Sequence, residues 1–131
     1  DDPRVHVHER YRQFSGAVDK ALAAYAIDAR VGALDSEYCP GDYSINGAGR
    51  IKLVGVAQRI VRCGFHVGAV ISVKPSAAAL AAVEEAYRIL GIPFAPRTFG
   101  ALADLAPGVG FKAVRTSVAA ALTGLMAHHT S

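Results

Sequence analysis

Residues 38–59, YCPGDYSINGAGRIKLVGVAQR, carry the clearest structural signal in this chain. Residues 43–46 alternate briefly in polarity, residues 47–49 hold two glycines in three positions, and residues 51–62 are rich in Val, Ile and Leu. β-Branched and aliphatic runs on either side of a glycine-bearing turn are typical of a hairpin. The stretch therefore predicts two strands joined by a short turn.

The chain after this hairpin predicts a third strand and a helix. Gly64 interrupts the apolar run, and residues 65–73 are apolar on both alternating faces, so we expect a strand covered on each side and central in the sheet. Lys74-Pro75-Ser76 ends that strand, and Ser76 can cap a helix that stops at Gly91. The helix carries an apolar stripe of Leu80, Val83, Tyr87 and Leu90.

The two ends of the sequence predict further helices. A stripe from Val7 to Tyr25 indicates a helix ending near Ile27, and residues 28–34 read as a short strand. A second stripe, after the Pro107-Gly108 break, consists of Phe111, Val114, Val118, Leu122 and Leu125. We therefore expect an α+β fold for residues 1–131 as a single domain, with a small mixed or antiparallel sheet and helices packed on it.

Composition narrows the class of protein. The 131 residues are 52% hydrophobic and 19% charged, with a net charge of +3, which predicts one compact domain and excludes disorder. No apolar run approaches the roughly 20 residues that cross a bilayer, so we expect no membrane segment. The basic residues are scattered, which argues against nucleic acid as a partner. Cys39 and Cys63 show no CxxC spacing, which favours a reducing, cytoplasmic setting.

Several residues of the hairpin and of the next strand match a known pattern. It consists of an Asp-containing strand, a turn, a Lys followed by x-x-Gly-x-Ala, and a Phe-His-x-Gly element. The matching positions are Asp42, Lys52, Gly55, Ala57, His66 and Gly68. On these residues the chain resembles the biotin/lipoate protein ligase catalytic domain, in the lipoate–protein ligase and octanoyltransferase branch.

The resemblance covers most of this chain but only the second half of the family's catalytic domain. The family's upstream Arg-Arg-x-x-Gly-Gly-Gly element, which supplies much of the acyl and nucleotide pocket, has no counterpart in the sequence. We expect the chain to be the C-terminal part of such a domain, completed by an upstream segment or a second copy, or else to have lost part of the machinery.

The resemblance implies roles for two candidate catalytic residues. Lys52 would stabilise negative charge on a phosphate or on the attacked carbonyl oxygen, and the alternative is a solvated strand-edge lysine. Some octanoyltransferases use a loop cysteine as an acyl-thioester nucleophile, and Cys39 lies in a comparable loop. Its spacing to Pro40 and Tyr43 differs by a couple of residues from that pattern, and the alternative is a small buried hydrophobe. Cys63 is expected to be structural.

The remaining matched positions would bind substrate. Gly55 and Gly68 would make room for the acyl chain beside Ala57, whereas a β-bulge is the alternative for either glycine. His66 would orient a carbonyl or accept a proton, but its place in the third strand favours a hydrogen-bonded core histidine. Asp42 would contact nucleotide or cap a turn. The pairs His6/His8 and His128/His129 lack carboxylate or cysteine partners, so we expect no metal site.

These residues leave three functions open. The leading hypothesis is attachment of lipoyl or octanoyl groups, through an acyl-adenylate made from ATP with Mg²⁺, to a lysine of a lipoyl domain. The acceptors would be the E2 components of 2-oxoacid dehydrogenases or the glycine cleavage H protein, whose acidic surfaces suit a basic enzyme. The second is an ATP-independent octanoyl or lipoyl transferase that uses Cys39. The third is a non-catalytic module that binds an acyl cofactor or a protein.

Overall fold

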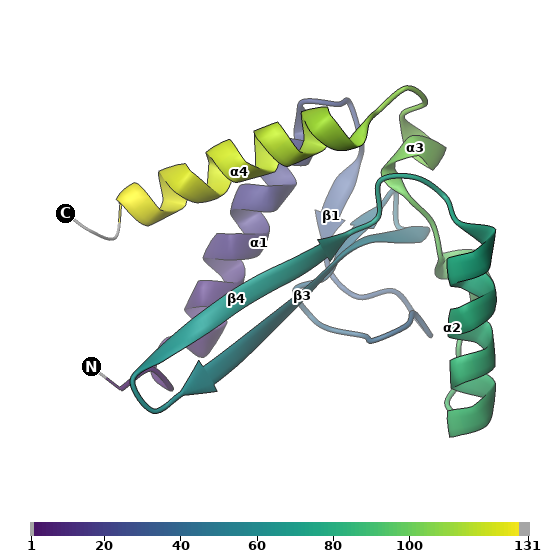
Figure 1. Ribbon diagram of the computed structural model, residues 1–131, viewed down its shortest axis with the longest axis horizontal. Coiled ribbons are helices and arrows are strands. Elements are labelled where there is room, and N and C mark those ends of the chain that lie inside the picture. Colours follow the sequence, from purple (N-terminus) through teal and green to yellow (C-terminus); the bar gives the residue numbers. More distant parts are fainter. Residues whose placement is uncertain (1, 129–131) are drawn as a thin grey trace.

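A computed structural model describes residues 2–128 of the chain. The elements are, in order, α1 (Val7–Ala23), β1 (Ala29–Val31), β2 (Ile45–Gly47), β3 (Ile51–Val61), β4 (Gly64–Ile71), α2 (Ala77–Leu90), the 3₁₀ helix η1 (Pro96–Thr98), α3 (Leu102–Leu105) and α4 (Phe111–Ala127) (Figure 1). This arrangement confirms the predicted α+β fold. No helix among the described residues combines the length and the apolar character needed to cross a membrane.

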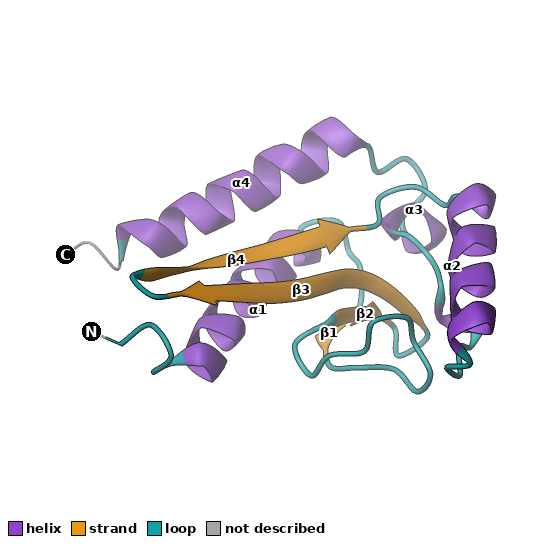
Figure 2. Cartoon of the chain, turned by 60° about the horizontal axis from the view of Figure 1, so that its bottom comes forward, coloured by secondary structure: helices purple, strands orange, loops and turns teal. Residues whose placement is uncertain are grey.

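The four strands form one antiparallel sheet in the order β1-β2-β3-β4 (Figure 2). The predicted hairpin is confirmed as β2 and β3. Its turn places Ala48 and Gly49 at φ values of 55° and 67°, in the left-handed region that suits Gly and Asn best. β3 and β4 pair along eight residues, from Val54↔Ile71 to Val61↔Gly64, and form a long two-stranded ribbon.

The prediction of a central position for β4 is wrong. β4 is the last strand of the sheet, and within residues 2–128 only β3 pairs with it. Val70 on this strand is 70% exposed. The apolar composition that normally marks a strand covered on both faces therefore marks here a strand with one uncovered face.

Helix α1 supplies most of the packing against the sheet, and α4 lies along α1. Val18 and Leu22 of α1 are fully buried, as the predicted stripe requires, although the helix ends at Ala23 and not near Ile27. Tyr25 and Ser117 join the two helical segments through a 2.7 Å hydrogen bond between their hydroxyls. In Figure 1 the β3–β4 ribbon passes in front of α1, so α1 and α4 leave the opposite face of the ribbon open.

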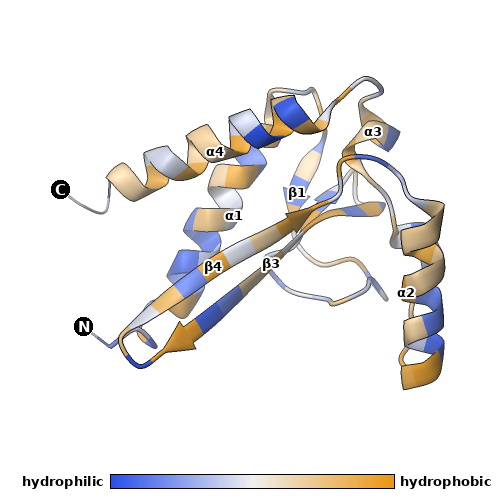
Figure 3. Cartoon of the chain, in the orientation of Figure 1, coloured by the Kyte–Doolittle hydropathy of each residue, from blue (hydrophilic) through white to orange (hydrophobic). Residues whose placement is uncertain are grey.

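Helix α2 has the predicted ends but not the predicted packing. The Ser76 hydroxyl accepts a 3.1 Å hydrogen bond from the Ala79 amide, and Gly91 adopts φ 65° at the C-terminal end. None of the residues of α2 is buried, so its apolar stripe does not cover the sheet. The helix stands at the end of the β3–β4 ribbon, away from α1 and α4, and presents apolar turns to the outside (Figures 2 and 3).

Candidate functional site

Lys52, near the start of β3, is buried against the loop that precedes β2. Its side chain is 1% exposed, and its Nζ donates hydrogen bonds to the carbonyl oxygens of Tyr38 at 2.8 Å and Cys39 at 2.7 Å. The same Nζ lies 2.9 Å from Glu37 Oε2 and 4.6 Å from the centroid of the Tyr38 ring. The 37–39 segment therefore accepts two hydrogen bonds from the ammonium and also supplies its counter-charge. The alternative of a solvated lysine is wrong.

Glu37 is the counter-charge of Lys52, and its side chain is also 1% exposed. Its Oε1 accepts a 2.9 Å hydrogen bond from the Leu34 amide. No described residue donates a well-aligned hydrogen bond to Oε2, so the 2.9 Å contact with Lys52 Nζ is an ion pair held by charge. A buried charge without its partner is costly, and the pair therefore fixes the loop to the start of β3.

Cys39 occupies a constrained position in this loop. Its φ of 42° lies in the left-handed region, which costs a non-glycine residue about 1–2 kcal/mol. Lys52 holds its carbonyl, and its amide donates a 2.5 Å hydrogen bond to Tyr87 Oη. The residue is exposed, and the Tyr87 hydroxyl also lies 3.9 Å from the thiol sulfur, within reach for donation to it. The alternative of a small buried hydrophobe is wrong.

The substrate-binding candidates of β3 and β4 share the open face of the ribbon. Ala57 pairs directly with Gly68, and Gly55 pairs with Val70, so each pair points to the same side of the sheet. The register between β2 and β3 contains an irregularity that sets Lys52 and Val54 against adjacent residues of β2. A Cβ on Gly55 would lie 3.4 Å from Lys52 Cε, so the lysine stem runs beside this glycine. Small residues thus line a flat surface next to Lys52.

His66 lies on the same face but outside any core. It is exposed, and a Cβ on Gly68 would come within 3.1 Å of its Cε1, so the ring lies along the backbone of Gly68. The prediction of a hydrogen-bonded core histidine is therefore wrong. An uncovered face leaves the imidazole open to solvent.

Asp42 and Cys63 lie away from Lys52's hydrogen-bond partners. The Ser44 amide donates a 3.0 Å hydrogen bond to the Gly41 carbonyl, which makes residues 41–44 a turn with Asp42 in its second position. This position suits the turn role proposed for Asp42. Cys63 is exposed in the β3–β4 turn and fills no core, so the expectation that it is structural is wrong.

The histidines near the ends of the chain have other partners. His6 Nδ1 lies 3.0 Å from Glu9 Oε2, and His8 Nδ1 lies 3.1 Å from the Tyr43 hydroxyl. His129, the second member of the C-terminal pair, lies outside the described residues. Among residues 2–128, no three His, Cys, Asp or Glu side chains gather as metal ligands.

Three residues of the site were missed from the sequence, namely Glu37, Tyr38 and Tyr87. Glu37 and Tyr38 directly precede Cys39. A buried lysine needs an acidic partner, so an expectation that Lys52 is buried could have pointed to Glu37. Tyr87 belongs to the apolar stripe of the predicted helix, and this pattern gives no sign of a contact with Cys39. Burial is the main cause that raises the pKa of both phenols above its usual value, so both keep their protons at neutral pH.

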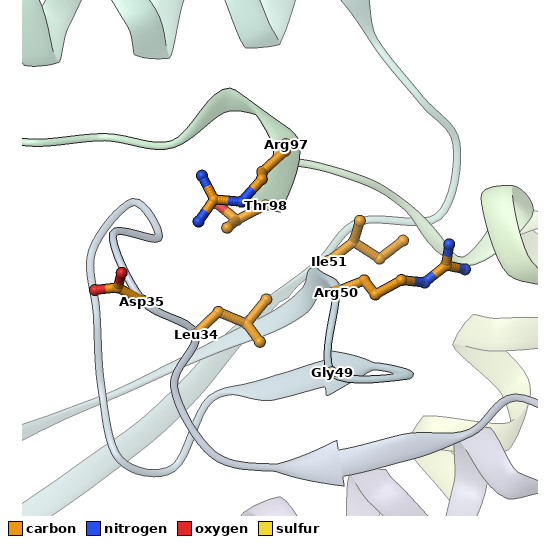
Figure 4. A pocket seen from close by; sticks show the side chains of 7 residues that line it. All are labelled: Leu34, Asp35, Gly49, Arg50, Ile51, Arg97 and Thr98. Carbon is orange, nitrogen blue, oxygen red and sulfur yellow. The ribbon is translucent and has the colours of Figure 1, made fainter.

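An open cavity of about 460 Å³ lies between the residues before Glu37, the β2–β3 turn and η1, and is lined among others by Leu34, Gly49 and Thr98. In Figure 4 Arg97 of η1 reaches over it on the side of Asp35, whereas the guanidinium of Arg50 points away. Ile51 lines the cavity next to Lys52 in the chain, but neither Lys52 nor Cys39 lines it.

Fold and sheet order together place the chain in a structural class. The chain has the fold of the biotin/lipoate protein ligase family, of the lipoate–protein ligase type, and the partial coverage fits the C-terminal half of such a domain. The solved structure that shows this is lipoate-protein ligase A bound with ATP, with a TM-score of 0.69 and 19% identity over 96% of this chain and 48% of the ligase chain.

A curated relative is the octanoyl-[GcvH]:protein N-octanoyltransferase of Geobacillus kaustophilus strain HTA426. It is 30% identical over 87 residues, which make up 66% of this chain and 30% of the relative. The chain thus spans about half of the ligase and less than a third of the transferase. No family model matches the chain.

Proposed function

We propose that residues 1–131 form the C-terminal part of a catalytic domain that moves an octanoyl or lipoyl group to a lysine of an acceptor protein through a thioester on Cys39. The observation that carries this proposal is the state of Cys39. Its thiol is exposed, its backbone is in the left-handed region, and its amide and carbonyl are each held by a buried or half-buried side chain. A strained and fully supported backbone at an exposed nucleophile is typical of functional positions.

The proposed reaction has two steps. The Cys39 sulfur attacks the carbonyl carbon of the donor's acyl group, so a C–S bond forms, the bond from that carbon to the donor nitrogen breaks, and the thiol proton goes to the departing amine. The acceptor's lysine amine then attacks the thioester carbon, so a C–N bond forms, the C–S bond breaks, and the sulfur regains a proton. Neither step consumes a nucleotide.

Lys52 supports this reaction as a positioning residue. Its ammonium donates hydrogen bonds to the carbonyls of Tyr38 and Cys39 and forms an ion pair with Glu37, so it fixes the nucleophile's backbone. This role differs from direct contact of Lys52 with a phosphate.

The acyl chain would lie along the open face of the ribbon. Gly55, Ala57 and Gly68 leave a surface without large side chains that begins beside Lys52, and exposed Val70 borders it. An apolar chain on this surface would remove apolar area from water at about 25 cal/mol per Å². His66 lies farther along the same face, where it would meet the far part of the chain or the donor protein.

The proposed partners follow from the relative's name and from charge. The curated relative takes its octanoyl group from GcvH, and we propose the glycine cleavage H protein as donor or acceptor here. Lipoyl domains of 2-oxoacid dehydrogenase E2 components are the other proposed acceptors, because acidic partners suit a chain of net charge +3.

The second candidate function is ATP-dependent ligation, because a ligase of the same fold was solved with ATP. The residues of this chain do not fit the nucleotide as the family would use it. Lys52, the cation expected to meet the phosphate, is 1% exposed; its Nζ donates to two carbonyls of the 37–39 segment, and its charge is paired with Glu37. The proposed reaction therefore uses neither ATP nor Mg²⁺.

The experiment that tests the proposal compares the wild-type chain with Cys39→Ser, using octanoylated H protein as donor and an apo lipoyl domain as acceptor, without ATP. We expect octanoyl transfer by the wild type, loss of transfer in Cys39→Ser, and full transfer by the control Cys63→Ser, since Cys63 lies in a distant turn. Acylation that requires ATP and octanoate and is indifferent to Cys39→Ser would establish the ligase instead. Binding of octanoylated H protein with no transfer under either condition would establish the binding module.

A further inference from the structure

Helix α2 contacts the Cys39 loop through a residue near its C-terminal end. None of its residues is buried, yet Tyr87 in its last turns reaches Cys39, and its ring packs on Phe94 with centroids 5.3 Å apart. Just beyond the helix, the Ala95 amide donates a 2.8 Å hydrogen bond to the Ser36 carbonyl. The helix and the segment after it are therefore hydrogen-bonded to the loop at two residues, Ser36 and Cys39.

The Tyr87 hydroxyl makes two different contacts with one cysteine. Its oxygen accepts the Cys39 amide proton at 2.5 Å, and its own proton is directed to the sulfur, 3.9 Å away. A phenol has one donor and acceptor lone pairs, so both contacts form at once. With the carbonyl of Cys39 on Lys52, both backbone polar groups and the thiol of this residue have a partner.

We infer that Tyr87 is the residue that orients the Cys39 thiol and donates a hydrogen bond to its sulfur whenever the sulfur carries negative charge. The inference rests on the proposed function, in which the sulfur is anionic as it attacks and again as it leaves the thioester. The Tyr87 proton stays on its oxygen throughout and stabilises the anion by a hydrogen bond. Charge-assisted hydrogen bonds are about twice as strong as neutral ones, so the contact strengthens when the thiolate forms.

The test is the rate of alkylation of Cys39 by iodoacetamide, which needs no acyl substrate. Cys63 is an exposed cysteine of the same chain and serves as the internal reference in peptide mass spectrometry. Tyr87→Phe keeps the ring on Phe94 and removes only the hydroxyl. Tyr25→Phe is the matched control, because it removes a hydroxyl hydrogen bond, to Ser117, far from the loop.

We expect Tyr87→Phe to slow alkylation of Cys39 about tenfold relative to Cys63, as the loss of one charge-assisted hydrogen bond implies. We also expect the Cys39 amide to exchange its hydrogen faster, a change that mere packing of the ring would not produce. Tyr25→Phe should alter neither readout. Unchanged alkylation and exchange in Tyr87→Phe would overturn the inference.

The inference and the proposed function can fail separately. If Cys39→Ser abolishes octanoyl transfer while Tyr87→Phe leaves the alkylation of Cys39 unchanged, the function stands and the role of Tyr87 is wrong. If Cys39→Ser transfers normally, the proposed function is wrong, and any slowing in Tyr87→Phe then has no part in acyl transfer. In the expected case, Tyr87→Phe lowers kcat for thioester formation by a similar factor and leaves KM unchanged.

Discussion

Replacing Lys52 by Met should destabilise the fold more than replacing any exposed lysine. The substitution leaves the Glu37 carboxylate buried without its ion-pair partner and takes a charged donor from two loop carbonyls. Breaking a buried pair by removing one partner costs about 3–5 kcal/mol, out of a total stability of about 5–15 kcal/mol. With an unfolding entropy of about 2 cal/mol/K per residue, a loss of about 4 kcal/mol lowers the Tm by about 15 °C in a chain of this length.

The assay is thermal and urea unfolding of Lys52→Met, Glu37→Gln and the double variant, with Lys112→Met as the control on the exposed start of α4. The double variant should recover about 1–2 kcal/mol relative to the sum of the single ones, because it leaves no uncompensated charge. Lys112→Met should stay within about 0.5 kcal/mol of the wild type. A loss below about 1 kcal/mol in Lys52→Met, with no coupling to Glu37, would refute the buried ion pair.

Three further substitutions test local features. Burial raises the pKa of Asp19, so its protonated carboxyl stabilises the fold fully below the pKa of the unfolded chain, and this contribution is lost as the pH rises through the pKa of the folded chain. Asp19→Asn should therefore be more stable to urea than the wild type at pH 7 but not at pH 3. An equal difference at both pH values would contradict this. Ser76→Ala removes the cap of α2 and should lower the opening free energy of its amides by about 1 kcal/mol in hydrogen exchange, and unaltered exchange would count against the cap. A Cβ on Gly100 would lie 2.7 Å from Ile51 Cδ1, so Gly100→Ala should cost about 1–3 kcal/mol in thermal unfolding, and the prediction fails if Ile51→Ala does not relieve that cost.

Local signals in the sequence predicted the local structure well. Gly49 adopts the left-handed backbone of the β2–β3 turn, and Ser76 and Gly91 lie at the two ends of α2, where their chemistry favours a helix boundary. These features depend on residues that are neighbours in the chain. The place of β4 at the edge of the sheet and the exposed stripe of α2 depend instead on which elements come to lie against them, and apolar composition does not tell one covered face from two.

The site was predictable in its parts but not in its assembly. The resemblance named Lys52, Cys39, Gly55, Ala57, Gly68 and His66, and the structure puts the first two in contact and the others on one face of the ribbon. The register irregularity beside Lys52 decides which residues share that face, and no residue type in the sequence predicts where such an irregularity occurs. Tyr87 could not be found from its stripe, because it meets Cys39 across 48 residues of chain.

The most direct test of the account is the position of the acyl group before it reaches the acceptor. The wild-type chain is mixed with octanoylated H protein without ATP or acceptor, quenched in acid, digested and analysed by peptide mass spectrometry. The account predicts one octanoyl thioester, on the peptide that contains Cys39, which hydroxylamine removes and an apo lipoyl domain discharges. An octanoyl group that forms only with ATP, or that resides on any peptide other than that of Cys39, would contradict it.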